Sequence, residues 1–206
     1  MLYPFPRSGL YVITPENQSL VRLMATVEAA LRGGAQVIQL RAKHRRPDLA
    51  EAKALLDLCH AYRVPLIVND DLKLAEHLGA DGVHLGRDDP DPALARSCLG
   101  ASAIIGVSCY ADLERAIWAE ETGASYVAFG AFFPSPTKPH AALAPIELLA
   151  SAKLRLSCPI VAIGGITPEN GAELLRAGAD LLAAIDGVFA GSDPCQAASR
   201  YARLFA

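Results

Sequence analysis

Apolar and polar positions along this chain follow two periods, one typical of buried strands and one typical of helices. Eight apolar runs of four to seven residues, rich in β-branched side chains, have the length and composition of strands. They begin at Leu10, Ala35, Pro65, Asp81, Ala103, Ser125, Pro159 and Asp180. Segments with helical periodicity lie between them, including 21–32, 72–78, 111–122 and 168–177. The pattern therefore predicts that strands and helices alternate along the chain.

A Gly-Ala pair recurs at the junctions between these elements. The pairs lie 45, 44 and 55 residues apart, at 34–35, 79–80, 123–124 and 178–179. Each pair follows a helical segment and precedes an apolar run. Glycine just past a helix end readily adopts the left-handed conformation that terminates a helix. We therefore interpret each pair as a helix-to-strand joint.

Alternating strands and helices specify a parallel sheet with right-handed crossovers, which either stays open or closes into a barrel. An open dinucleotide-binding sheet would carry a G-x-G-x-x-G turn after its first strand, and the sequence LYVITPEN has none. Eight units in 206 residues average about 26 residues each, which fits a compact barrel. The sequence therefore predicts a single-domain (β/α)8 TIM barrel over residues 1–206.

The composition is that of a globular protein, with 52% hydrophobic and 20% charged residues. A formal net charge of −3 argues against nucleic acid or an anionic membrane as a partner, because both require a basic surplus. We find no apolar stretch long enough to cross a bilayer and no export signal at the start of the chain. The five cysteines are scattered and include no Cys-x-x-Cys pair, so we expect free thiols and a cytoplasmic location.

The end of the second predicted strand carries a cluster of cations. Gln39, Arg41 and Lys43 alternate along QLRAK and therefore point to one face, and Arg45 and Arg46 follow. An amide and two cations that leave a buried strand need partners, whereas Arg45 and Arg46 fit a solvated loop. In a net-acidic protein this cluster predicts a local site for a phosphate or diphosphate.

Acidic side chains end the next two strands. The third strand ends in Asn69-Asp70-Asp71, and the fourth leads into HLGRDD, which ends at Asp89. Carboxylates at neighbouring strand ends, together with phosphate oxygens and water, form the usual environment of Mg²⁺. We choose Asp70 and Asp89 as its ligands, and expect Asp71 to cap the helix that starts at Leu72, although Asp70 is an alternative cap. His84, inside the fourth strand, is equally compatible with a site residue and a core imidazole.

The fifth and sixth strands end in hydroxyl groups. Ser108 lacks a Ser-His-Asp context, so we expect it to bind a ligand rather than to attack one. The long, proline-rich loop over residues 131–143 contains Ser135, Thr137 and Lys138, which suit phosphate recognition in an active-site lid. A plain surface loop is the alternative interpretation, and the sequence does not specify whether the segment closes over a substrate.

The seventh and eighth strands provide a second set of anion-binding features. Gly164-Gly165 permits close approach of the backbone, and Thr167 with Pro168 has the pattern of a helix start. Barrels frequently bind phosphate here, and Ile185-Asp186 continues the same wall. A metal-assisted anion site at strands 2 to 4 and a metal-free one at strands 7 to 8 suggest a reaction between two phosphorylated substrates, one of which loses diphosphate.

Six motifs, in their order and spacing, resemble the thiamine phosphate synthase family: QLRAK, LIVNDD, GVHLGRDD, GVS, PSPTK and AIGGIT. The resemblance extends over nearly the whole chain. It implies a Mg²⁺-dependent transferase that joins hydroxymethylpyrimidine diphosphate to thiazole phosphate, giving thiamine phosphate and diphosphate. The residues that it implies for the pyrimidine diphosphate are Gln39, Arg41, Lys43, Asn69, Ser108 and Lys138. Those for the thiazole phosphate are Ser135, Thr137, Gly165, Ile185 and Asp186.

Two positions depart from the family pattern. Serine is commoner at the position of Asp186, and a carboxylate beside a phosphate is unfavourable unless it points away. Threonine is commoner at Ser135, where the hydroxyl is retained. With Arg41, Ser108 and Lys138 as catalytic residues, the chemistry needs cations and a metal but no protein nucleophile.

Three other functions remain open. A thiazole tautomerase on the same barrel would have a histidine where Ala131 stands. A phosphate-binding barrel without activity would not need the acidic pair. An aldolase would need a Schiff base on Lys43 or Lys138. The family includes homodimers, although no segment of this sequence specifies one.

Overall fold

The computed structural model describes residues 3–16, 18–43, 47–135 and 142–206. Eight strands pair in parallel and in sequence order, and the last pairs with the first, so the sheet closes into a barrel. The strands are Gly9–Ile13 (β1), Ala35–Leu40 (β2), Leu66–Asn69 (β3), Gly82–Leu85 (β4), Ile104–Tyr110 (β5), Tyr126–Phe129 (β6), Ile160–Ile163 (β7) and Leu181–Ala184 (β8). The predicted TIM barrel is confirmed, and an open sheet is excluded.

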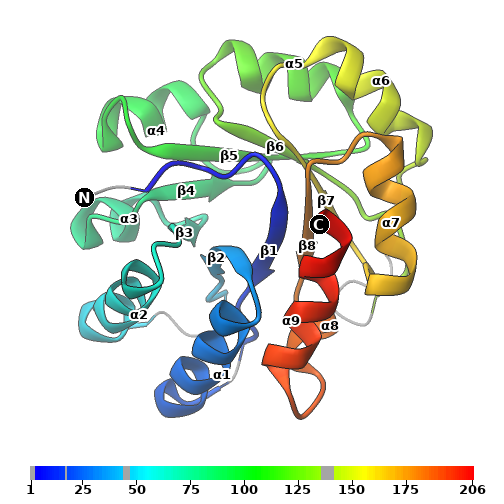
Figure 1. The fold of residues 1–206 in the computed structure, drawn as a ribbon. Coiled ribbons are helices and arrows are strands. Elements are labelled where there is room, and N and C mark those ends of the chain that lie inside the picture. Colours follow the sequence, from blue (N-terminus) through cyan, green and yellow to red (C-terminus); the bar gives the residue numbers. More distant parts are fainter. Residues whose placement is uncertain (1–2, 17, 44–46, 136–141) are drawn as a thin grey trace.

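Helices surround the barrel on its outer face (Figure 1). They are Leu20–Arg32 (α1), Leu49–Ala61 (α2), Leu72–Leu78 (α3), Pro92–Leu99 (α4), Leu113–Glu121 (α5), Glu147–Arg155 (α6), Pro168–Ala177 (α7), Asp186–Phe189 (α8) and Pro194–Ala202 (α9), followed by a 3-10 turn at Arg203–Phe205. Among the helices of the described ranges, none is long and apolar enough to cross a membrane.

The repeated glycines terminate the helices as predicted. Gly34, Gly79, Gly123 and Gly178 have φ values of 100°, 65°, 101° and 120°. Side chains with a Cβ rarely adopt such positive angles. The repeat in the sequence therefore reflects a conformational requirement at each joint between a helix and the following strand.

The strands separate two apolar cores. Side chains that point outward pack against the helices and form the larger core. Side chains that point inward form a smaller core inside the barrel, which includes Tyr11, Val37, Ile67, Tyr126 and Val161. Successive side chains of a strand alternate between the two faces. The inward-pointing side chains that follow this inner core therefore lie at the carboxyl ends of the strands.

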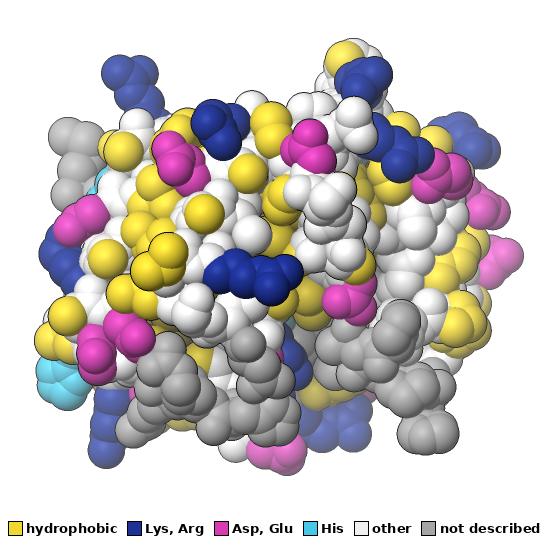
Figure 2. All heavy atoms as spheres, turned by 90° about the horizontal axis from the view of Figure 1, so that it is seen from below, with side chains coloured by type: hydrophobic (Ala, Val, Ile, Leu, Met, Phe, Trp, Pro, Cys, Tyr) yellow, Lys and Arg dark blue, Asp and Glu magenta, His cyan; other side chains and the backbone are white. Residues whose placement is uncertain are grey.

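Charges of both signs are interspersed among the described residues on the face shown in Figure 2. This distribution agrees with the small net charge of the sequence. Any concentration of charged side chains is therefore local. One such cluster lies at the carboxyl end of the barrel.

Candidate active site

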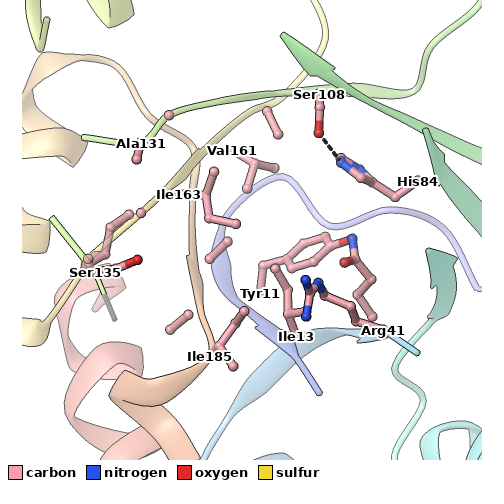
Figure 3. Close-up of a pocket in the computed structure, with 18 of the residues that line it drawn as sticks. Tyr11, Ile13, Arg41, His84, Ser108, Ala131, Ser135, Val161, Ile163 and Ile185 are labelled. Atoms are coloured by element: carbon pink, nitrogen blue, oxygen red, sulfur yellow. Dashed lines mark hydrogen bonds between the residues drawn. The ribbon is translucent and has the colours of Figure 1, made fainter. Parts of the chain in front are cut away.

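A cavity of about 590 Å³ opens at the carboxyl end of the barrel and is lined by residues from all eight strands. That volume is typical of sites for small molecules. His84 and Ser108 lie on one side of it, Ala131 and Ser135 on the opposite side, and Val161 and Ile163 between them (Figure 3). The predicted residues that line it are Gln39, Arg41, Lys43, Asn69, Asp70, Ser108, Ser135, Gly165, Ile185 and Asp186.

Both described cations at the end of β2 are paired with carboxylates. Arg41 donates from Nη1 to Oε1 of Glu16 at 2.6 Å, and the two side chains are only 18% and 12% exposed. The same Glu16 oxygen accepts from the backbone N–H of Lys43 at 3.2 Å. The Nζ of Lys43 lies 3.4 Å from Oδ2 of Asp70. The cluster predicted from the alternation along β2 therefore faces the cavity, and Glu16 is the partner that fixes Arg41.

The two predicted metal ligands lie together beside this cluster. Asp70 has a φ of 62°, an uncommon conformation for a residue with a side chain, and its backbone N–H donates to the carbonyl of His84 at 2.9 Å. Oδ2 of Asp89 accepts from the backbone N–H of Gly86 at 2.6 Å. Burial and the neighbouring carboxylate of Asp70 raise the pKa of Asp89, against the opposing effect of Gly86 and Lys43.

Asp71 has the capping role that the sequence predicts. Its side chain accepts from the backbone N–H of Leu74 and begins α3. The cap leaves Asp70, the preceding residue, to face the cavity. The division of roles between these two adjacent carboxylates follows from one residue of offset along the chain.

Hydrogen bonds connect five side chains across the cavity floor. Nε2 of Gln39 donates to the hydroxyl of Tyr11, which lies 2.8 Å from the hydroxyl of Tyr126. That hydroxyl lies 2.8 Å from Nδ1 of His84, and Nε2 of His84 lies 2.8 Å from Oγ of Ser108. His84, 8% exposed, is therefore both buried and part of the cavity wall.

The opposite wall consists of the loops that follow β6, β7 and β8. Gly164 and Gly165 have φ values of 104° and 59°, and a Cβ on Gly165 would lie 2.3 Å from the carbonyl oxygen of Pro134. Thr167 caps α7 as predicted, in a capping box with Asn170. Asp186 is exposed and is the first residue of α8. Glycine turns and helix starts present backbone N–H groups, which suit an anion.

Two predicted site residues, Thr137 and Lys138, lie outside the described residues, as do Arg45 and Arg46. Within the described parts of the chain, no group of three or more His, Cys, Asp or Glu side chains is arranged to hold a metal ion. Any metal near Asp70 and Asp89 would therefore need further ligands from substrate or water.

Sequence reasoning missed several residues that organise the cavity. Tyr11 and Tyr126 occupy apolar strands and resemble ordinary core residues, and their hydroxyl contacts depend on closure of the barrel. Glu16 lies in a loop without a recognisable motif. Arg115 donates to the carbonyl oxygens of Ser108 and Gly86, both at 2.9 Å, and so ties the end of β5 to the loop after β4. Its helical position alone predicts only a solvated charge.

A closed parallel barrel whose polar cavity opens at the carboxyl ends of its strands has the architecture of (β/α)8-barrel enzymes. A family model described as thiamine monophosphate synthase matches residues 10–188. The chain belongs to this family of enzymes.

Individual relatives agree with this assignment. Over 96% of its length the chain is 53% identical to the thiamine-phosphate synthase of Azoarcus sp. (strain BH72), covering 97% of that protein. It is 49% identical over its whole length to the thiamine-phosphate synthase of Methylococcus capsulatus, covering 92% of that protein. The solved thiamine phosphate pyrophosphorylase from Pyrococcus furiosus is 33% identical and superposes with a TM-score of 0.84, over 96% of this chain and 95% of that one. The resemblance predicted from the motifs is confirmed.

Proposed function

We propose that this protein joins hydroxymethylpyrimidine diphosphate to thiazole phosphate, releasing diphosphate and forming thiamine phosphate. Membership of the family supports the reaction. The observation that carries the proposal is a single cavity with a charged wall on β2 to β4 and a wall of glycine turns and helix starts on β7 and β8. These walls suit two different phosphorylated substrates that react in the space between them.

The charged wall would bind the diphosphate. Of its described charged side chains, Arg41, Lys43 and Asp70 line the cavity. Glu16 and Asp89 lie beside them, in contact with Arg41 and Asp70 respectively. A diphosphate brings further negative charge, which the carboxylates of this wall oppose. The wall therefore requires additional positive charge, for which Lys138 and a divalent cation are the candidates.

The acidic pair fits Mg²⁺. Asp70 and Asp89 are hard oxygen donors held close enough that one raises the pKa of the other, a strain that a cation would relieve. Two carboxylates, with the remaining positions left to phosphate oxygens and water, are a typical environment for Mg²⁺. When bound, Mg²⁺ would neutralise charge on the departing diphosphate.

The residues of this chain would act by position and electrostatics. Arg41 and Lys43 would bind the diphosphate as it leaves the pyrimidine CH₂ group. The contact with Glu16 fixes the position of Arg41. Gln39, Asn69 and Ser108 would hold the pyrimidine over the cavity floor. Gly165, Ser135, Thr137 and the backbone at Ile185 and Asp186 would orient the thiazole phosphate. The C–O bond to the diphosphate would break first, and the thiazole nitrogen would then attack the CH₂ carbon.

Asp186 lies on the wall proposed for the thiazole phosphate and carries a negative charge. If the carboxylate of Asp186 pointed toward the bound phosphate, the two negative charges would repel each other and weaken binding. The exposure of Asp186 at the rim supports an arrangement in which backbone N–H groups hold the phosphate and the carboxylate points away from it.

The proposal is tested by incubating the purified protein with each substrate alone and with both, in the presence of Mg²⁺. We expect diphosphate and thiamine phosphate in equal amounts, and only when both substrates are present. Isomerisation of the thiazole phosphate without diphosphate release would instead support a tautomerase. Binding of both compounds by calorimetry without any product would support a barrel that has lost activity, and either result would overturn the proposal.

A further inference from the structure

The hydrogen-bonded chain across the cavity floor has a direction. We refer to Gln39, Tyr11, Tyr126, His84 and Ser108 as the floor chain. The amide Nε2 of Gln39 can only donate, so the hydroxyl of Tyr11 accepts at that end. Each of the following hydroxyl groups has one proton to donate, and a neutral imidazole has one protonated nitrogen. These counts restrict where each proton lies.

One order satisfies every contact. Tyr11 donates to Tyr126, Tyr126 donates to Nδ1 of His84, and the protonated Nε2 of His84 donates to Ser108. Every proton of the chain then has an acceptor, and the proton of the Ser108 hydroxyl is left for a ligand. Ser108 borders the cavity, so this proton is available to a bound substrate.

The reverse order leaves a buried proton without an acceptor. If Ser108 donates to Nε2, then Nδ1 of His84 is protonated and donates to Tyr126. The two tyrosine hydroxyls then have two protons but only one contact between them, because Gln39 also donates to Tyr11. An unsatisfied buried hydroxyl is costly, so the first order is favoured.

The protein holds the Tyr126 hydroxyl firmly in place. The ring of Phe5 stacks on that of Tyr126 with centroids 4.2 Å apart and an interplanar angle of 2°. Gly106 leaves room for it, since a Cβ there would lie 2.1 Å from Cζ of Tyr126. Burial raises the pKa of both tyrosines, so both stay protonated and act as hydrogen-bond relays rather than as acids.

We propose that Tyr126 is a positioning residue, whose hydroxyl holds His84 as the tautomer protonated on Nε2 and thereby makes Ser108 a hydrogen-bond donor toward the substrate. The role of Ser108 as a substrate contact rests on the proposed function. The tautomer of His84 does not, and it can be measured without substrate. Tyr126 itself acts through His84 and Ser108.

The tautomer is tested by ¹⁵N NMR of the labelled protein, using two-bond correlations within the imidazole rings. The chain has five histidines, and a His84→Gln variant assigns the signals of His84. We expect Nδ1 at the shift of an unprotonated ring nitrogen and Nε2 at that of a protonated one. In Tyr126→Phe the two shifts should move toward each other, because no donor then selects a tautomer. A wild-type His84 protonated on Nδ1 would overturn the proposal, even if Tyr126→Phe does not fold.

Kinetics test whether Tyr126 acts through Ser108. We expect Tyr126→Phe to lower kcat/KM about 10-fold, the usual size for one misdirected hydrogen bond, but less than about 2-fold in a Ser108→Ala background. Tyr3→Phe is the matched control, since this hydroxyl donates to the carbonyl of His60 at the opposite end of the barrel. Equal losses in both backgrounds would show a structural role and overturn the proposal. If no variant forms product while the NMR result holds, only the proposed function fails.

Discussion

Two groups of charged residues, one at each end of this barrel, make different contacts. At the amino end, buried Asp81 accepts from the backbone N–H groups of Tyr3 at 3.0 Å and Leu66 at 2.8 Å, and pairs with His60 at 2.9 Å. Arg96 there donates to several backbone carbonyls. These charges tie the start of one strand to its neighbours.

At the carboxyl end, charged side chains contact one another around a cavity. Arg41 pairs with Glu16, Lys43 pairs with Asp70, and Asp89 lies beside Asp70 with a raised pKa. These described side chains place charges of both signs around the cavity. On our proposal, position along the barrel axis therefore separates charges that stabilise the fold from charges that bind substrate.

The largest effect on stability should come from the amino end. In Asp81→Asn, one carboxylate oxygen becomes an NH₂ group. That group cannot accept the hydrogen bonds that the oxygen now receives from its N–H donors. We expect the free energy of unfolding in urea to fall by about 3 kcal/mol, because buried donors are left without an acceptor. Steady-state kcat/KM of the folded variant should stay within about 2-fold of wild type. A large loss of activity with unchanged stability would contradict the distinction between the two ends.

The largest effect on activity should come from the carboxyl end. Asp89→Asn retains an acceptor for Gly86 but removes one charge from the proposed metal site. We expect diphosphate release to slow by at least ~100-fold, in line with loss of a major electrostatic contact, while stability is unchanged or slightly higher. The neighbouring, exposed Asp88 provides the control, and Asp88→Asn should behave as wild type.

Lys138 should be as sensitive, although it lies outside the described residues. Lys138→Ala removes the cation that the sequence predicts for the diphosphate, so we again expect a loss of at least ~100-fold. Diphosphate release near the wild-type rate in both Asp89→Asn and Lys138→Ala would refute the assignment of this wall.

Two glycines with similar backbone angles provide the next comparison. Gly165 has a φ of 59° and would place a Cβ 2.3 Å from Pro134, whereas Gly79 has a φ of 65° and open space around it. Both Ala variants bear the strain of a positive φ, about 1 kcal/mol. Only Gly165→Ala should also raise the KM for thiazole phosphate, by about 30-fold, because the clash displaces the loop that binds it. Equal KM values in the two variants would remove Gly165 from the phosphate site.

The smallest effects should separate two similar ion pairs. Lys43–Asp70 at the carboxyl end and Lys153–Asp180 at the amino end have lysines that are 48% and 49% exposed. We expect Lys43→Gln and Lys153→Gln each to lower stability by less than about 1 kcal/mol, as is usual for exposed pairs. Only Lys43→Gln should lower kcat/KM, by about 10-fold, through its lost contact with diphosphate. Identical kinetics for both variants would show that Lys43 serves only the fold.

Much of this arrangement could be predicted from the sequence because it depends on local rules. Each strand is an apolar run, and each joint has its glycine, as at Gly79. The alternation of Gln39, Arg41 and Lys43 predicts one face, and all three line the cavity although β2 ends at Leu40. Once the barrel is assumed, the two aspartates after β3 lie at its carboxyl end, and the expected cap by Asp71 is confirmed.

The floor chain could not be predicted, since its contacts join strands that are distant in sequence. Tyr11 and Tyr126 are 115 residues apart, and only closure of the barrel brings their hydroxyls to 2.8 Å. A tyrosine in an apolar run looks the same whether its hydroxyl has a partner or faces solvent. Likewise, nothing in the loop around Glu16 specifies that it fixes Arg41. The contact depends on the bend of the chain after β1.

The most direct test of the central claim is the Mg²⁺ dependence of the complete reaction. Diphosphate and thiamine phosphate are measured together with both substrates, over a series of Mg²⁺ concentrations and with a chelator, for wild type and Asp89→Asn. We predict equal formation of both products by wild type, loss of both with the chelator, and a higher Mg²⁺ requirement in the variant. Product formation that is indifferent to Mg²⁺, or the absence of both products at every concentration, would contradict the account.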